Sequence, residues 1–321
     1  MFRTKRSVRV AAMVALAASM TGAALASSTS VAAGKDPSAS AGYWLFTGNG
    51  GVFSYGTANF GAPASDPARC PVAPLSGRAP QPNGTCWSMA ATHDGNGYWV
   101  INSFTGAIYR FGNAGNFGSP HAKFANTSPE FLPVMRQIVA SADSLGYWVY
   151  EVGASGMGTV DRYGDAGFFG DTTSYVKQHP GVQLNGQPVG MAATPDGKGY
   201  WEVYSDGGVF AFGAARFAGS MANRPLAAPI VAIAASATGN GYLLVASDGG
   251  VFAFGDARFA GSRAGLPHEP IVDIARNPEG PGYWLVSNNG EIFTFGGAPF
   301  LGTLSTFGGR GYVYGMTTKR G

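Results

Sequence analysis

Few residues in this sequence have the types and spacing that catalysis requires. The patterns Gly-x-Ser-x-Gly, His-Glu-x-x-His, Gly-x-x-x-x-Gly-Lys and Cys-x-x-Cys, which place nucleophiles, metal ligands or phosphate-binding loops, do not occur. The histidines lie at unrelated positions: His93, His121, His179 and His268. The sequence therefore predicts no catalytic residue, no cofactor and no metal site, although separate segments could still assemble an active site.

The two cysteines are the clearest pair with chemistry of their own. Cys70 and Cys86 lie in one stretch rich in Pro, Gly and Asn. An even pair at short range in an exported chain is typical of a disulfide, which in the loop-closure model contributes on the order of 3 kcal/mol. A nucleophilic or metal-binding thiol would need a His and Asp constellation nearby. We therefore predict a Cys70–Cys86 disulfide.

The first residues have the order of a secretory signal peptide. Four basic residues precede an apolar run over residues 10–18, and small residues follow. The run is shorter than the roughly 20 apolar residues that span a bilayer. Cleavage after Ala26 or Ala33 fits the pattern, and we favour Ala33. Residues 1–33 are thus expected to be a signal peptide, residues 34–41 a linker, and the mature protein to be secreted with no membrane span.

The charge balance argues against a nucleic-acid partner. Of 21 basic and 18 acidic residues, four basic ones lie in residues 1–33, so the rest of the chain is close to neutral. Nucleic-acid binding requires a basic surface that displaces phosphate counterions. With 50 Gly in 321 residues and 13% aromatic residues, the composition instead indicates many short strands joined by tight turns.

Internal repeats dominate the sequence. The phrase GYLLVASDGGVFAFGDARFAGS at residues 241–262 recurs at residues 199–220 and 282–303, and looser copies begin at Gly42, Gly97 and Gly146. A basal unit of about 41 residues with insertions explains all six copies. Each unit divides into four short apolar segments, and turns such as Asp248-Gly249-Gly250 suit a tight hairpin.

Four short strands in about 40 residues are typical of a propeller blade. The first unit lacks its innermost strand, and residues 312–318 match the missing pattern. The sequence therefore predicts an all-β fold: a six-bladed β-propeller of four-stranded blades over residues 42–318, closed by the C-terminal strand, which completes the first blade. Residues 319–321 form a tail.

The aromatic residues of the repeat have two interpretations. A Trp recurs at one position of the second strand in five units, and Leu243 replaces it in the sixth; the five are Trp44, Trp99, Trp148, Trp201 and Trp284. They could stack on sugars. Their strict recurrence favours packing between blades, and we expect them to be buried.

The insertions are the better place to look for binding residues, because loops on a rigid scaffold concentrate function. The extra length falls in residues 62–86, 120–136 and 171–187, which are loops that enter a first strand. We expect these loops to lie on the same rim of the ring as the hairpins between the second and third strands. The candidate residues of this rim are Arg69, Arg78, His121, Lys123, Phe124, Phe131, Tyr175, Lys177 and His179. The insertions could equally be tolerated without any ligand.

The repeat GYLLVASDGGVFAFGDARF is similar to a tandem repeat of exported actinobacterial proteins, where it stands alone or is appended to cell-wall hydrolases or peptidases. The resemblance covers residues 42–318 and is most specific in the last three units. It implies a secreted, propeller-like repeat module and carries over no functional residues.

These observations favour a secreted, non-catalytic binding or interaction propeller that recognises a cell-surface or cell-wall glycan. One alternative is an exported hydrolase or lyase with its active site on the loop-rich rim. The other is a scaffold for exported protein partners.

Overall fold

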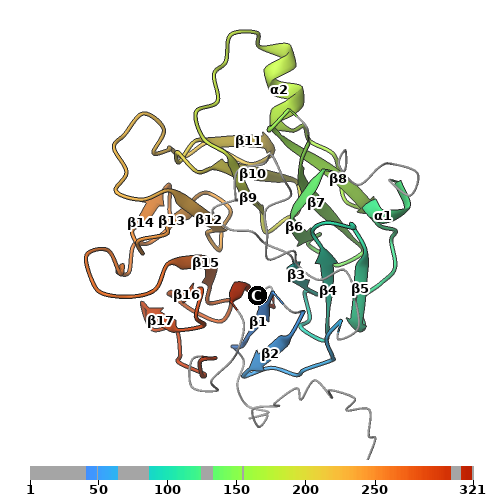
Figure 1. Cartoon of the computed structure of the whole chain (residues 1–321), viewed down its shortest axis with the longest axis vertical. Helices are drawn as coiled ribbons and strands as arrows, with labels where there is room; N and C mark the ends of the chain where they lie inside the picture. Colours follow the sequence, from blue (N-terminus) through green and yellow to red (C-terminus); the bar gives the residue numbers. More distant parts are fainter. Residues whose placement is uncertain are drawn as a thin grey trace, which may run out of the picture.

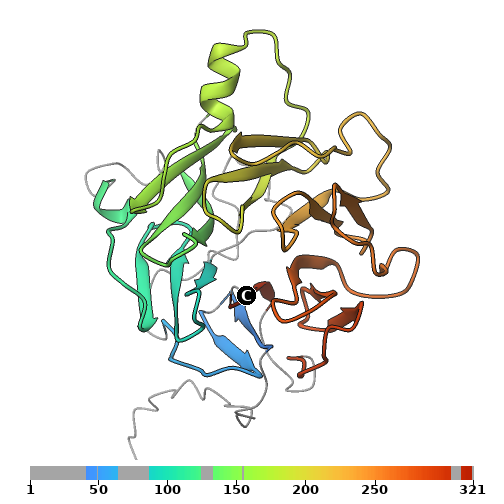
Figure 2. The same cartoon turned by 180° about the vertical axis from the view of Figure 1, so that it is seen from behind.

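Six three-stranded antiparallel sheets stand around a common axis (Figure 1). The computed structural model describes residues 41–48, 50–63, 87–123, 133–153, 155–304 and 312–319. Within these residues the chain is all-β apart from two short helices. The view from behind shows the same ring of sheets, with the C-terminal strand near its centre (Figure 2). This arrangement is consistent with a six-bladed propeller.

Each sheet has an inner strand near the axis, a middle strand and an outer strand. The inner strands are β3 (Trp87–Ala91), β6 (Val134–Ala140), β9 (Pro188–Ala193), β12 (Ile230–Ala235), β15 (Ile271–Arg276) and β18 (Val313–Thr318). The middle strands are β1 (Tyr43–Thr47), β4 (Gly97–Asn102), β7 (Gly146–Val152), β10 (Gly199–Tyr204), β13 (Tyr242–Ala246) and β16 (Tyr283–Ser287). The outer strands are β2 (Val52–Tyr55), β5 (Ile108–Gly112), β8 (Gly158–Gly164), β11 (Val209–Gly213), β14 (Val251–Phe254) and β17 (Ile292–Phe295). Helix α1 (Pro120–Lys123) lies between β5 and β6, and α2 (Thr172–Gln178) lies between β8 and β9.

The first and last described strands belong to one sheet. Strand β18 pairs antiparallel with β1, with Tyr43 opposite Thr318 and Leu45 opposite Met316. Each inner strand also contacts the inner strands of the two adjacent sheets, in the order β18, β3, β6, β9, β12, β15 and again β18. We number the sheets in this order, so that sheet 1 contains β18, β1 and β2 and sheet 6 contains β15, β16 and β17.

The expectation of four strands in each sheet is wrong, because each described sheet has three. The segment expected to form the fourth strand, here called the outer segment, leaves the outer strand without pairing to it. In sheet 5 this segment comprises residues 255–261, and Gly255 and Gly261 at its ends have φ of 64° and 134°. These left-handed conformations turn the chain away from an extended strand. The hydroxyl of Tyr283 in sheet 6 accepts a hydrogen bond from the amide of Ala260 at 3.2 Å.

The same tyrosine hydroxyl also donates to the carbonyl of Gly261 at 2.5 Å. An equivalent bond occurs at every junction between neighbouring sheets, and the first tyrosine of a middle strand is the donor each time. The pairs are Tyr98 with Gly61, Tyr147 with Gly118, Tyr200 with Gly170, Tyr242 with Gly219, Tyr283 with Gly261 and Tyr43 with Gly302. The outer segments are therefore fixed by the next sheet rather than by their own.

The apolar core is divided into clusters that lie between neighbouring sheets. The five recurring tryptophans are fully buried, which confirms that they are core residues. Each packs on the first tyrosine of the next sheet, with ring centroids 5.3 to 5.8 Å apart. Each indole N–H donates to a carbonyl of its own outer segment, as Trp201 does to Arg216 at 2.9 Å. Their polar atoms are thus occupied inside the core.

Removing one of these rings tests the packing between sheets. We expect Trp201→Ala to lower the free energy of unfolding by about 3 to 5 kcal/mol, the usual range for emptying a large aromatic site. Chemical denaturation followed by circular dichroism measures the change. Phe217→Ala is the matched control, because Phe217 is 61% exposed and its truncation should stay within about 0.5 kcal/mol. Equal effects of the two variants would contradict this account of the core.

Candidate functional site

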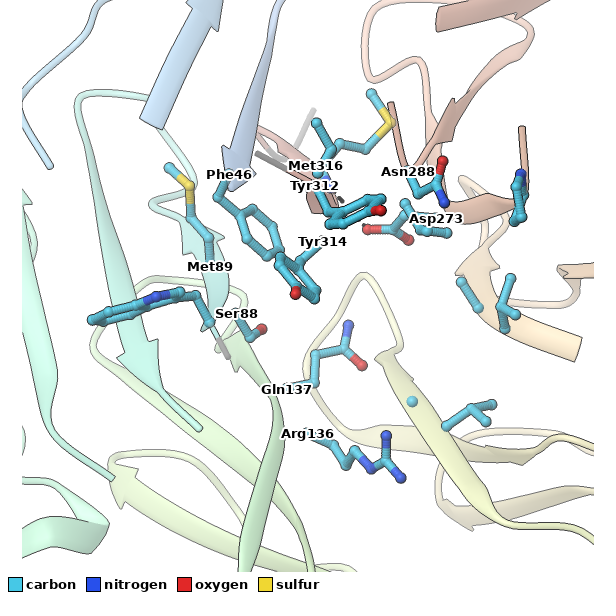
Figure 3. A pocket seen from close by; sticks show the side chains of 18 of the residues that line it. Phe46, Ser88, Met89, Arg136, Gln137, Asp273, Asn288, Tyr312, Tyr314 and Met316 are labelled. Atoms are coloured by element: carbon cyan, nitrogen blue, oxygen red, sulfur yellow. Dashed lines mark hydrogen bonds between the residues drawn. The ribbon is translucent and has the colours of Figure 1, made fainter. Parts of the chain in front are cut away.

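The inner strands enclose a cavity of about 260 Å³ on the axis of the ring. All six inner strands contribute residues to its wall. Figure 3 shows its principal polar and aromatic side chains: Arg136, Gln137, Asp273, Asn288, Tyr312 and Tyr314. An open, polar cavity on this axis was not predicted from the sequence.

A repeated irregularity of the inner strands directs side chains toward the axis. In five sheets, the pairing of the inner and middle strands skips one inner residue, as in a β-bulge. The skipped residues are Arg136, Val189, Val231, Val272 and Tyr314. All five line the cavity. The bulge thus makes successive residues of one strand face the axis.

In three sheets a polar side chain of the inner strand links it to the next inner strand. Ser88 Oγ accepts a hydrogen bond from the amide of Ile138 at 3.1 Å, and Gln137 Oε1 accepts one from Met191 at 2.8 Å. Asp273 Oδ2 accepts one from the amide of Met316 at 2.9 Å. These three bonds cross from sheet 2 to 3, from 3 to 4, and from 6 to 1. They hold the polar side chains of the cavity wall in fixed positions.

Glycine makes room for these bonds on the receiving strand. A Cβ on Gly190 would lie 3.0 Å from Gln137 Oε1, and a Cβ on Gly315 would lie 2.8 Å from Asp273 Oδ2. A side chain at either glycine would therefore push against the polar group of the preceding sheet. At these two junctions, the hydrogen bond from one inner strand to the next therefore requires glycine on the receiving strand.

The cavity wall carries two groups of opposite charge. Burial raises the pKa of the Asp273 carboxyl to about 7. The two backbone N–H donors stabilise its charge and so lower the pKa, but burial has the larger effect. Burial also lowers the pKa of the Arg136 guanidinium, although the charge of Tyr150 opposes this effect. Arg136 is on β6 of sheet 3 and Asp273 is on β15 of sheet 6, which lie opposite one another in the order of the ring.

The wall of the cavity also includes residues of the loops that enter the inner strands. Tyr312, immediately before β18, is 67% exposed. Gln187 ends the insertion that contains α2, and Asn288 belongs to the hairpin between β16 and β17. The loop-rich rim expected from the sequence is therefore connected to the axial cavity through these residues.

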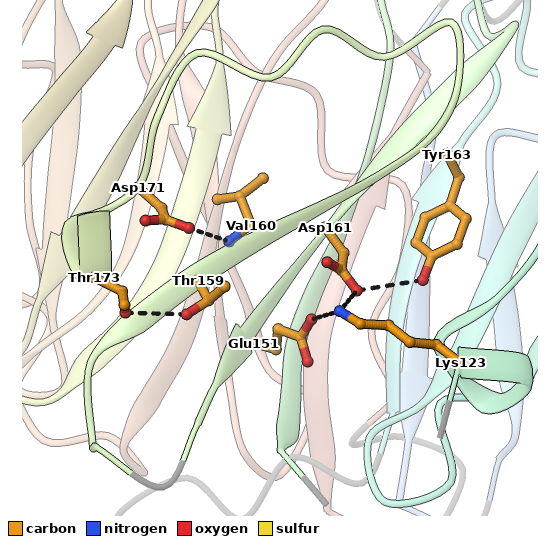
Figure 4. Close-up of polar contacts among 8 residues, drawn as sticks. All are labelled: Lys123, Glu151, Thr159, Val160, Asp161, Tyr163, Asp171 and Thr173. Atoms are coloured by element: carbon orange, nitrogen blue, oxygen red, sulfur yellow. Dashed lines mark hydrogen bonds and ion pairs between the residues drawn. The ribbon is translucent and has the colours of Figure 1, made fainter. Parts of the chain in front are cut away.

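Helix α1 is fixed to sheet 3 by a charged contact (Figure 4). Lys123 Nζ lies 2.6 Å from Asp161 Oδ2 and 3.7 Å from Glu151 Oε1. The side chain of Glu151 is only 3% exposed, and its burial raises its pKa to about 8. Tyr163 also donates to Asp161 at 3.4 Å. Lys123 therefore binds a structural partner.

Helix α2 is fixed to sheet 4 by a second buried carboxyl. Asp171 caps the helix by accepting a hydrogen bond from the amide of Ser174 at 2.7 Å. The amide and the hydroxyl of Thr172 both donate to Glu202, which is fully buried on β10. Tyr150 donates to the same carboxyl at 3.2 Å. Burial raises the pKa of Glu202 to about 8, against the Thr172 donors, which lower it.

The candidate residues of the rim do not form one site in the described part of the chain. His121 and Lys123 are on α1, whereas Tyr175 and Lys177 are on α2 and His179 caps it. Only Tyr175 and His179 meet, with stacked rings 4.2 Å apart, and none of these residues lines the axial cavity. The other candidates lie outside the described residues: Arg69, Arg78, Phe124 and Phe131. The predicted Cys70–Cys86 disulfide, the signal peptide and residues 34–40 also lie outside them.

Sequence reasoning missed the residues of the axial cavity. Their signal was a departure from the repeat: where the inner strand has Gly190, Ala232 or Gly315, two other units have Gln137 and Asp273. A carboxylate or an amide in a strand of small apolar residues marks a position where the core pattern does not explain the residue. The register that aligns these positions becomes clear only from the strand pairing.

Comparison with known proteins gives no family for the chain: no protein-family model matches it, and no curated protein matches it either. Among the described residues, no three His, Cys, Asp or Glu side chains are placed to hold a metal ion. Within the same residues, no helix has the length and apolar character required to cross a membrane.

The buried carboxyl of Glu202 predicts a pH dependence of stability. Its pKa rises from 4.5 to about 8 on folding, so the folded state binds the proton more tightly. The stability that Glu202 contributes is therefore fully present below pH 4.5 and is lost as pH rises toward 8, by roughly 1.4 kcal/mol for each pH unit. Thermal unfolding between pH 5 and 8 should show a shallower decline for Glu202→Gln than for the wild type. The exposed Glu269→Gln control should keep the wild-type slope, and an unchanged slope in Glu202→Gln would contradict this role.

Proposed function

We propose that this chain is an exported six-bladed β-propeller that binds a cell-surface or cell-wall saccharide in its axial cavity and catalyses no reaction. The proposal combines a closed ring, which makes the axis a rigid site, with the chemistry of the side chains that line it.

Closure of the ring by the C-terminal strand is supported by contacts at the junction of sheets 6 and 1. Tyr43 donates to the carbonyl of Gly302, 259 residues away in the chain, at 2.5 Å. Its ring packs on Trp284 with centroids 5.4 Å apart, as at the other Trp–Tyr junctions. The same apolar cluster contains Val313 and Met316 of β18. A closed ring leaves no sheet without neighbours on its two faces.

Truncation tests the closure. Deletion of residues 312–321 removes β18, leaves β1 without its inner partner and opens the axial cavity. We expect aggregation or a loss of the cooperative unfolding transition, measured by light scattering and calorimetry. Deletion of residues 320–321 alone is the control and should leave the melting temperature unchanged. A monomeric 312–321 deletion with wild-type melting temperature would show that this strand does not close the ring.

The observation that carries the proposed binding function is the combination of groups in the cavity wall. Aromatic rings of Phe46, Trp87 and Tyr312 occur there with the amides of Gln137 and Asn288. Ligand pockets typically combine apolar surfaces with a few placed polar groups. Aromatic faces suit the C–H faces of a sugar ring, and amide groups can both donate to and accept from its hydroxyls. A hydroxyl-rich ligand of one or two sugar units is the class that uses both kinds of group.

The cavity favours binding over glycoside hydrolysis. Most glycoside hydrolases use two carboxyl groups on either side of the scissile bond. Among the described residues that line the cavity, Asp273 is the single carboxylate. The other buried carboxyls, Glu151 and Glu202, contact α1 and α2 at the positions described above.

Binding is tested with the full chain and a set of soluble cell-wall and cell-surface oligosaccharides. We expect at least one to bind, and Tyr312→Ala to weaken it at least tenfold in calorimetric titration, because this substitution removes the exposed ring beside the cavity. Tyr175→Ala is the matched control: it removes another exposed tyrosine from the same rim, on α2 and outside the cavity. Loss of binding only in Tyr175→Ala would move the site to α2, and no binding by any oligosaccharide would refute the function.

A further inference from the structure

We infer that the axial site selects a saccharide that carries a protonated amine, with Asp273 as the counter-ion of that amine. This inference rests on the proposed saccharide-binding function and specifies its ligand class. The Asp273 carboxyl in the cavity wall carries it, and Asn288 lies beside it (Figure 3).

The Asp273 carboxylate is held in place by the backbone. Oδ1 accepts from the amide of Ile274 at 2.8 Å, and Oδ2 accepts from the amide of Met316 at 2.9 Å. A carboxylate has about four acceptor sites, so these two bonds leave acceptor capacity on both oxygens. Asp273 is partly exposed and lines the cavity. A ligand in the cavity therefore meets a fixed carboxyl group, and a cationic ligand would favour its ionised form.

No cationic side chain of the described residues forms an ion pair with Asp273. The other titratable groups of the described cavity wall are Arg136 on the opposite sheet, Tyr312 and Tyr314. A desolvated charge that only amides stabilise is expensive in a protein interior. A cationic ligand would supply the missing opposite charge.

Asn288 lies beside Asp273 on the same side of the cavity. Its Oδ1 is buried and has no hydrogen-bond partner among the described residues. Its backbone is fixed on both sides, because its N–H donates to Pro270 at 2.9 Å and its carbonyl accepts from Val313 at 2.7 Å. A buried acceptor without a donor is uncommon and needs a partner. The Asn288 oxygen is closed off from the cavity, so Asp273 is the acceptor that a ligand reaches there, and an ammonium group supplies three donors to it.

A metal ion is a poorer occupant than an amine. Calcium takes six to eight oxygen ligands, whereas this side of the cavity offers one carboxylate. An acetylated amine is also poorer, because it is neutral and has a single N–H donor. The site is thus built to distinguish a free amino sugar from its N-acetyl form.

The experiment compares two probes on the full chain by calorimetric titration at pH 7. One is the β-1,4-linked tetramer of N-acetylglucosamine, and the other is the same tetramer with all acetyl groups removed. We expect the amino tetramer to bind at least tenfold more tightly. In Asp273→Asn this preference should disappear because the amino tetramer loses affinity, while binding of the acetylated tetramer remains. The exposed Asp256→Asn control should retain the preference.

The preference ratio separates ligand recognition from a structural role, since a general loss of folding lowers both affinities together. Asp273→Ser provides a second variant, in which the ratio should also fall, and it keeps the test open if Asp273→Asn does not fold. Equal affinities of the two tetramers, or a ratio unchanged in both variants, would overturn the amine assignment and leave saccharide binding intact. Binding of neither tetramer would also overturn it, and the wider oligosaccharide set would then decide the proposed function separately.

Discussion

The hydrogen bond from a tyrosine hydroxyl to a glycine carbonyl of the preceding sheet is the constraint on which this structure depends. A single three-stranded sheet of short strands buries too little apolar surface to be stable alone. The aromatic rings between sheets supply the missing burial, but each brings a polar atom that needs a partner. The glycine carbonyl is that partner, so each sheet can form its core only against its neighbour.

The axial cavity follows from this arrangement. Since packing and polar satisfaction are provided at the flanks of the sheets, the inner strands need not fill the axis with apolar side chains. They can accommodate bulges, and the residues there can be polar. Three hydrogen bonds to the side chains of Ser88, Gln137 and Asp273 link adjacent inner strands around the axis. The contacts that hold the sheets together are thus separate from the side chains on the axis, whose chemistry can vary.

Much of the fold could be predicted from the sequence, because the strands and turns of one unit recur in the other units of the repeat. The burial of Trp201 and its equivalents followed from recurrence alone. The fourth strand could not be excluded, since four strands are typical of a propeller blade and the path of residues 255–261 is decided by the hydroxyl of Tyr283 in another sheet. The cavity could not be predicted either, because Asp273 and Asn288 line it together with residues that are distant in the sequence and meet only when several sheets surround one axis.

Sheet 1 unites the beginning and the end of the chain, and this has a consequence for biogenesis. The other five sheets each form from one continuous stretch, so their strands can pair soon after they are synthesised. Sheet 1 has to wait for β18, and the loop closed by the Tyr43–Gly302 contact spans 259 positions. Contacts over such distances in sequence form slowly. Sheet 1 is therefore expected to form last, and until it does, Tyr43 and Trp284 lack the contact that buries them against each other.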